Sequence, residues 1–198
     1  MAIKKLTPEQ RLFTIKLSEG LLDVNLWIKK AEELLVAAKI LEMQVNAWWS
    51  EVHYENGQYV GPNEHENVQD AYLMLVAYAI ENYCKSLLIH RNRESLKNKI
   101  IIKIPHYIKH HDLIKLARSI NLDLTIHEEE LLSRLTRNSV WAARYPIPVD
   151  LDSFRLTQNL SDRNSYLIAY SGPDDVNLII NFIDRLRKYV SKEIDNAS

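Results

Sequence analysis

Three arginines and a tryptophan stand at helical spacing late in the chain. Arg134, Arg137, Trp141 and Arg144 lie at successive offsets of three, seven and ten residues from the first, so an α-helix would place them on one face. No acidic residue occurs between positions 131 and 149, which would make this face cationic. Guanidinium groups offer a planar fork of donors and stay charged, which suits phosphate recognition. The spacing therefore predicts a phosphate-binding helix face.

A structural role for the same arginines is an equally open interpretation. Arg137 would then pair with a core carboxylate such as Glu81 and tie two helices together. Glu81 and Lys85 are spaced i, i+4, so they are either site residues facing the arginine helix or an intrahelical ion pair. The spacing alone does not choose between these two interpretations.

Three segments can be compared with known families: Ala79-Ile80-Glu81-Asn82-Tyr83-Cys84-Lys85-Ser86-Leu87-Leu88, His110-His111-Asp112-Leu113 and Arg137-Asn138-Ser139-Val140-Trp141-Ala142-Ala143-Arg144. Together they resemble the HEPN superfamily of helical bundles. The resemblance covers about Val68 to Ile147. In active members it implies a metal-independent endoribonuclease, with an arginine and a histidine that orient the scissile phosphate and promote attack by the ribose 2′-hydroxyl. It also implies a homodimer whose two motifs meet in a cleft. Many members belong to toxin–antitoxin or other defence systems, so an antitoxin-type protein is a further expected partner.

This chain departs from the family's pattern at the histidine. After Arg137 and Asn138, the window in which the family has its histidine holds Ala142, Ala143 and Arg144, so no imidazole is available there for proton transfer. We therefore expect a non-catalytic or weakly active protein that binds RNA, a nucleotide or an acidic partner. The expected binding residues are Arg134, Arg137, Arg144, His111, Glu81 and Lys85. The alternative is a metal-independent endoribonuclease of toxin or defence type, with Arg137, Asn138 and Arg144 as its catalytic residues.

Other histidines offer weaker alternatives. His111 would reach the same cleft if its segment lies as the resemblance implies, or it simply caps or packs its own helix. His106 and His110 are spaced i, i+4 and would bind a metal from one helical face, but no carboxylate or cysteine completes the set. We expect no metal site and no cofactor, because the chain also lacks a glycine-rich phosphate loop and a dinucleotide fingerprint.

Charge is segregated along the chain although the net charge is only −1. From Ile40 to Cys84 there are seven acidic residues and no lysine or arginine, whereas Lys85 to Arg118 holds nine basic residues against two acidic ones. One interpretation is that these are solvated faces that pair with one another. The other is a local phosphate-binding surface on the basic segment.

Glycine and proline placement predicts helices throughout. All four glycines and six prolines fit at element ends or in loops, which leaves long uninterrupted segments with apolar residues at helical spacing. No internal repeat or heptad seam is evident. The first expected helix begins with the capping box Thr7-Pro8-Glu9-Gln10, and further helices are expected at about 23–52, 68–92, 111–120, 128–144 and 174–194. Thr125-Ile126-His127-Glu128 forms a second capping box before the helix at 128–144. A loop or small hairpin is expected from His53 to Glu66, and Ile100 to Ile102 form either a short strand or a packed loop.

These elements predict one all-α domain over residues 1–198, with its core at about 21–194. It would be a compact bundle of five to six helices, and the resemblance implies an up-and-down, HEPN-like core. The 198 residues, 46% of them hydrophobic, suffice for one core, and the single cysteine, Cys84, excludes an internal disulfide framework. The first ten residues contain no apolar run typical of a signal peptide, and the longest apolar run, Ala71 to Ile80, is too short to span a membrane. We therefore expect a cytoplasmic protein.

Overall fold

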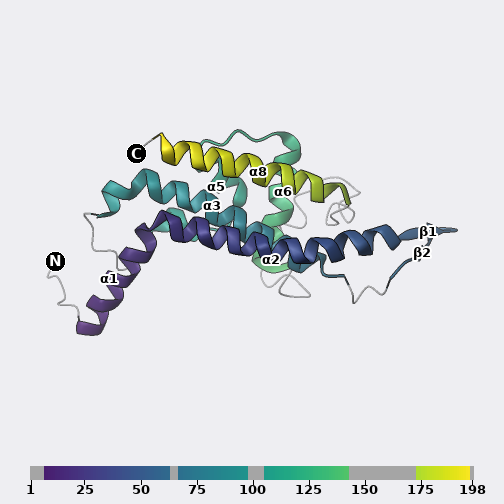
Figure 1. The fold of residues 1–198 in the computed structure, drawn as a ribbon, viewed down its shortest axis with the longest axis horizontal. Helices are drawn as coiled ribbons and strands as arrows, with labels where there is room; N and C mark the ends of the chain where they lie inside the picture. The colour runs from purple at the N-terminus through teal and green to yellow at the C-terminus, as the bar shows by residue number, and fades with distance from the viewer. Residues whose placement is uncertain (1–6, 63–66, 98–104, 143–172, 197–198) are drawn as a thin grey trace.

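The computed structural model describes residues 7–62, 67–97, 105–142 and 173–196 (Figure 1). Within these ranges the chain forms seven α-helices, one π-helix and a two-stranded hairpin, which confirms the all-α fold class. The elements are α1 (Pro8–Leu22), α2 (Val24–Glu51), β1 (His53–Glu55), β2 (Gln58–Val60), α3 (Gln69–Lys97), α4 (His106–Lys109), α5 (Leu113–Ser119), α6 (Ile126–Arg137), the π-helix η2 (Asn138–Ala142) and α8 (Pro173–Asp195). The predicted Ile100–Ile102 segment lies outside the described residues.

Both predicted capping boxes are present. At the start of α1, the Thr7 N–H donates to Gln10 Oε1 at 3.0 Å, and the Gln10 N–H donates to Thr7 Oγ1 at 3.2 Å. At the start of α6, the Thr125 N–H donates to Glu128 Oε2 at 2.8 Å, and the Glu128 N–H donates to Thr125 Oγ1 at 3.3 Å. Each box satisfies donors that a helix N-terminus leaves unpaired, which is why these local motifs fix where the helices begin.

The segment after α2 is the hairpin rather than an open loop. His53 pairs with Val60 and Glu55 with Gln58 in an antiparallel register. The two residues between the strands, Asn56 and Gly57, have φ values of 51° and 79°. Positive φ at both central positions is the requirement of a type I′ turn, and Asn-Gly is its preferred sequence.

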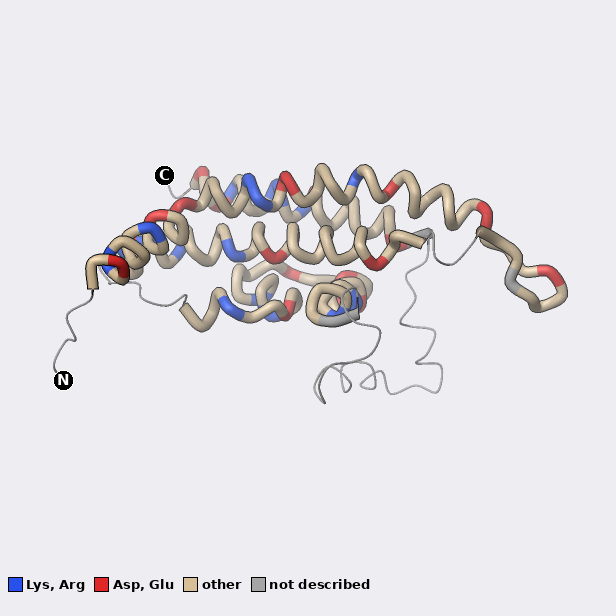
Figure 2. The backbone as a smooth tube through the Cα atoms, turned by 90° about the horizontal axis from the view of Figure 1, so that it is seen from below, with Lys and Arg blue, Asp and Glu red and all other residues tan. Residues whose placement is uncertain are grey.

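Helix α3 is the centre of the bundle. Helices α1, α2, α5, α6 and α8 and the π-helix all contact it, and Figure 2 shows α3 between α2 and the layer that contains α5 and α6. More than half of its residues are buried. The helix runs to Lys97, five residues beyond the predicted end, with Leu96 packed in a smaller second core cluster near α1 and α4.

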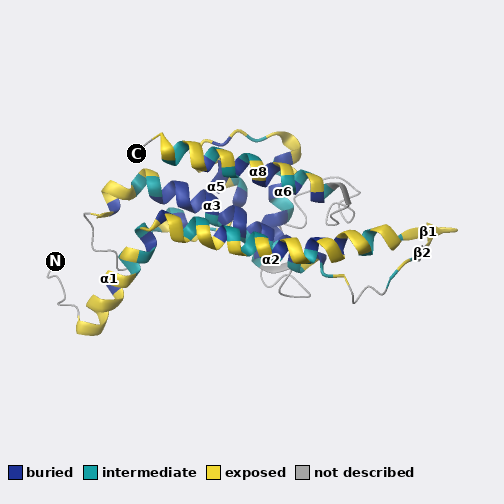
Figure 3. Cartoon of the chain, in the orientation of Figure 1, coloured by how far each residue is buried: buried dark blue, intermediate teal, exposed yellow. Residues whose placement is uncertain are grey.

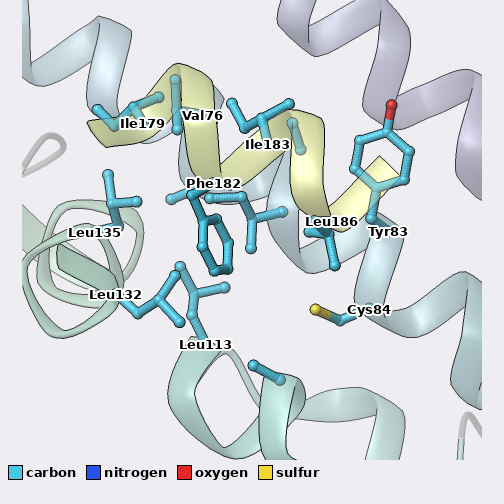
Figure 4. Close-up of a cluster of buried hydrophobic side chains, with 14 of the residues drawn as sticks. Val76, Tyr83, Cys84, Leu113, Leu132, Leu135, Ile179, Phe182, Ile183 and Leu186 are labelled. Atoms are coloured by element: carbon cyan, nitrogen blue, oxygen red, sulfur yellow. The ribbon is translucent and has the colours of Figure 1, made fainter. Parts of the chain in front are cut away.

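The main core joins α2, α3, α5, α6 and α8. Figure 4 shows Val76 and Cys84 of α3 with Leu132 of α6 and Phe182 of α8 in this cluster. Cys84 is fully buried, and burial raises the pKa of its thiol to about 12, so it is an inert core side chain. The four-residue α4 was not predicted, and α5 is shorter than predicted because Asp112 caps it, accepting from the Lys115 N–H at 3.0 Å.

Helices α1 and α2 contain many exposed residues, as Figure 3 shows, and several of these residues are apolar. Leu12, Phe13 and Ile15 in the first half of α1 are each more than half exposed. On α2 the exposed side chains lie on the side away from α3. Despite these exposed residues, no helix in the described ranges combines the length and hydrophobicity that a membrane span requires.

Two buried tyrosines make a testable pair. Tyr72 is 2% exposed, and its hydroxyl has no hydrogen-bond partner among the described residues; Tyr83 is equally buried, but its hydroxyl donates to Glu32 and accepts from Arg187 Nε at 2.9 Å. We expect Tyr72→Phe to leave the free energy of unfolding unchanged or raise it by about 1 kcal/mol, because an unpaired buried hydroxyl is removed. Tyr83→Phe should lower it by about 1.5 kcal/mol, because bonds to charged groups are lost. Urea denaturation of both variants measures the difference, and equal losses would contradict it.

Candidate functional site

Arg134 is engaged in an ion pair inside the protein. Its Nη2 atom lies 2.5 Å from Asp175 Oδ1, and both side chains are about 15% exposed. The pair ties α6 to α8. A ligand that bound Arg134, as the sequence predicted, would therefore compete with Asp175, which lies 41 residues further along the sequence.

Arg137 is buried without such a partner. It is 5% exposed, and none of the residues described in the structure accepts a hydrogen bond from its guanidinium or forms an ion pair with it. Burial lowers the pKa of Arg137, and the positive charge of Arg134 lowers it further. The predicted ion pair between Arg137 and Glu81 is absent. No guanidinium nitrogen of Arg137 is among the fully buried atoms that lack a partner, so this largely buried cation keeps contact with solvent but has no paired anion among the described residues.

Asn138 follows Arg137 and begins the π-helix. The residue is 8% exposed, and its backbone N–H donates to the carbonyl groups of Arg134 and Leu135. Its side-chain amide bonds to no residue within the described part of the chain, so Arg137 and Asn138 together hold several unused donors in a buried position.

The π-helix corrects the predicted length of the late helix. The α-helix ends at Arg137 instead of continuing to Arg144, and η2 occupies Asn138–Ala142. A π-turn holds more residues than an α-turn, so α-helical offsets do not carry the arginine face past Arg137. The continuous α-helix assumed for Arg134, Arg137, Trp141 and Arg144 is therefore wrong beyond Arg137, and the shared face stays a prediction. Arg144 itself lies outside the described residues.

Glu81 is the centre of a second polar cluster. Lys85 Nζ donates to its Oε1 at 2.6 Å, and His111 Nδ1 lies 2.8 Å from its Oε2. The side chains of Glu81 and Lys85 are below 10% exposed, whereas that of His111 is 55% exposed. Burial by itself would raise the pKa of Glu81, but the bonds from His111 and Lys85 outweigh it and hold this pKa below its ordinary value. Glu81 and Lys85 thus form an intrahelical ion pair, and the second carboxylate oxygen of Glu81 contacts His111.

Two hydrogen bonds place these clusters on adjoining segments. The Tyr78 hydroxyl, one turn before Glu81, donates to the Ser139 carbonyl at 3.1 Å. The Leu113 N–H, two residues after His111, donates to Thr136 Oγ1 at 3.1 Å. The structure therefore brings the three segments of the resemblance together around α3. Sequence reasoning did not single out Thr136 or Asp175, because each makes its contact across the fold.

The structure does not support the alternative of a metal site formed by His106 and His110. Helix α4 ends at Lys109, and His110 is extended backbone, so His106 and His110 do not share a helical face. No group of three or more metal-binding side chains occurs in the described ranges. His110 Nδ1 is buried and has no partner there, and burial lowers the pKa of His110.

The basic segment pairs mostly outside the acidic segment. Arg91 pairs with Glu193 of α8, Arg118 with Glu129 of α6, and Lys115 with Asp112 of its own segment. Within the described residues, Lys85–Glu81 is the only ion pair of a lysine or arginine that joins the two segments as one interpretation predicted. Several basic side chains are therefore already engaged, which weakens the interpretation of this segment as an open phosphate-binding surface.

Comparisons with known proteins identify no relative of this chain. Protein-family models, curated proteins and solved structures were searched, and none matches this chain.

Proposed function

We propose that this chain is a HEPN-like protein that binds a phosphate-bearing ligand, RNA or a nucleotide, at Arg137, and that it has little or no catalytic activity. The burial of Arg137 at 5% exposure without an acceptor among the described residues is the observation that supports this proposal most strongly. An isolated buried charge is unfavourable, and a phosphate would supply both the opposite charge and the acceptor oxygens.

The neighbouring residues suit the same ligand. Asn138, the next residue in the sequence, adds amide donors, and Arg134, although paired with Asp175, contributes positive potential that acts on Arg137. A π-turn at this point supports the assignment because such turns occur frequently at functional sites. We assign Arg134 a positioning role, since its partner Asp175 holds α6 against α8.

The burial of Arg137 also predicts how binding depends on salt. One phosphate group inserted at Arg137 releases few counterions, so the logarithm of the binding constant should fall with a slope of about −1 against the logarithm of salt concentration. An open surface on the segment from Lys85 to Arg118 would instead engage several phosphates and give a slope several times steeper.

Binding of single-stranded RNA, structured RNA and a nucleotide, measured in EDTA at several salt concentrations, tests the proposal. We expect Arg137→Gln to weaken binding at least about tenfold, the loss of one charge-assisted contact. Arg93→Gln is the matched control, because Arg93 is an exposed arginine of the basic segment. If Arg93→Gln weakened binding and Arg137→Gln did not, the ligand site would belong to the basic segment and the proposal would fail.

The Glu81–His111 pair favours a second candidate function, a metal-independent endoribonuclease. A carboxylate that holds one ring nitrogen orients the imidazole and leaves the other nitrogen available, and the exposed side chain of His111 is reachable from solvent. His111 would then replace the histidine missing after Arg137. In the same EDTA assay, cleavage that is lost in His111→Gln while binding persists would favour this candidate; binding without any cleavage would exclude it.

A further inference from the structure

The turn that carries Arg137 is covered on every side. Residues 135–139, which join the end of α6 to the start of η2, are all buried, and none of them is more than 9% exposed. An α-helical turn holds about 3.6 residues and a π-turn somewhat more, so five consecutive buried residues leave no side of this turn open. Arg137 keeps only a small contact with solvent. A ligand therefore reaches its guanidinium through a small opening and not along an open groove.

Hydrogen bonds hold this turn closed from two neighbouring segments. The Ser139 carbonyl accepts from the Tyr78 hydroxyl of α3 at 3.1 Å, and Thr136 Oγ1 accepts from the Leu113 N–H at the start of α5 at 3.1 Å. The Ser139 hydroxyl also donates to the Thr136 carbonyl at 2.9 Å. Opening the turn to admit a polynucleotide backbone would break these bonds in a buried setting, where unpaired polar groups are costly.

The shape of the opening distinguishes two kinds of phosphate. An internal phosphodiester is attached to the strand on both sides, so it contacts an arginine only where the strand can run past that arginine. A terminal phosphate monoester is attached on one side only and can enter a small opening end-on. The burial of residues 135–139 therefore favours a phosphate at the end of a molecule.

Charge and donor number favour the same group. Arg137 offers five N–H donors, and none of them has an acceptor among the described residues. The positive charge of Arg134 acts on Arg137 and lowers its pKa, so an anion is favoured there. A phosphate monoester carries a charge of about −1.5 to −2 at neutral pH and three acceptor oxygens. An internal phosphodiester carries a single negative charge and has two non-bridging oxygens.

We infer, on the basis of the proposed function, that the site at Arg137 binds the terminal phosphate monoester of a nucleotide or of an RNA end and excludes the internal phosphodiesters of an RNA strand. The ligand class is thereby narrower than RNA or nucleotides in general. The length of an attached RNA strand should add little to the affinity, because only its terminal phosphate enters the site.

Isothermal titration calorimetry of the wild-type chain with two matched nucleotides tests the inference. The probes are adenosine 5′-monophosphate and the methyl ester of its phosphate, which has the charge and the two terminal oxygens of an internal phosphodiester. We expect the monophosphate to bind at least about tenfold more tightly. Because both probes are measured on the wild type, the comparison does not depend on whether a variant folds. Equal affinities would overturn the inference.

RNA probes of one sequence separate the two sources of the terminal phosphate. A short strand with a 5′-phosphate, the same strand with a 3′-phosphate and a strand with hydroxyls at both ends are compared with its circular form, which has internal phosphodiesters only. We expect at least one phosphorylated end to bind about as tightly as the monophosphate if RNA ends are the source. If only the free nucleotide binds, the source is a nucleotide. Circular RNA that binds as tightly as the phosphorylated strands would contradict the inference.

Arg137 variants distinguish failure of this inference from failure of the proposed function. Arg137→Gln should abolish the preference for the monophosphate over its methyl ester, whereas the exposed Arg93→Gln should keep it. Arg137→Lys, which keeps the charge and loses the planar fork, should keep part of it. Circular dichroism checks that each variant is folded. If Arg137→Gln weakened both probes equally from equal wild-type affinities, the phosphate site would stand and the inference would fail. If neither probe bound, or a folded Arg137→Gln bound like the wild type, both would fail.

Discussion

Replacing Arg137 by methionine is expected to stabilise the ligand-free protein and to abolish phosphate binding. The guanidinium is buried at 5% exposure without an acceptor among the described residues, and methionine fills a similar volume without charge. Substitution of a buried charge by an apolar side chain of similar size should raise the free energy of unfolding by about 1–3 kcal/mol. Urea denaturation in phosphate-free buffer measures this change.

Arg134→Met is the matched control for this prediction, and its effect should have the opposite sign. It leaves Asp175, a carboxylate that is 14% exposed, without its partner, so the free energy of unfolding should fall by about 2–4 kcal/mol. A nucleotide or phosphate should raise the melting temperature of the wild type but not that of Arg137→Met. If both variants were destabilised alike, Arg137 would have an internal partner and the proposed anion site would be lost.

Glu81→Gln is expected to cost about 3–5 kcal/mol of stability, because it leaves Lys85 buried without a counter-charge. The Lys85 side chain is 6% exposed, and Glu81 is its ion-pair partner at 2.6 Å. The control is Glu94→Gln, which breaks the exposed Lys97–Glu94 pair and should change stability little. Urea denaturation at neutral pH compares the two; a small effect of Glu81→Gln would show that Lys85 finds water or another acceptor.

The same carboxylate predicts a loss of stability in acid. The pKa of Glu81 is lower in the folded protein than in the unfolded chain, so the unfolded chain binds more protons as the pH falls below about 4.5. The stability that Glu81 contributes is complete above that pH and is lost as the pH falls through the lower folded value. The wild type should therefore lose stability in this range more steeply than Glu81→Gln, as acid denaturation of both proteins would measure.

The local motifs of this protein were predictable because their contacts lie within a few residues. The Thr7 and Thr125 capping boxes and the Asn56-Gly57 turn each depend on neighbouring backbone groups, and all are present. The end of α6 was not predictable in this way. Between Ile126 and Pro146 the sequence contains no glycine or proline that would end the helix. Nevertheless, η2 begins at Asn138, and the next carbonyl, that of Ser139, accepts a hydrogen bond from the Tyr78 hydroxyl, 61 residues earlier. The HEPN resemblance, the RNA or nucleotide ligand and the site residues stay predictions.

The sequence by itself determined which segments are helical, where most of them begin, and that the late arginine motif has no histidine after it. Only the tertiary structure decided that Arg134 is paired with Asp175, that Arg137 is buried beside it, and which face of α2 remains exposed. The physical reason is the range of the interactions. A helix cap closes over three or four residues, whereas the choice of ion-pair partner and buried face depends on side chains that are brought together only when helices far apart in the sequence pack on α3.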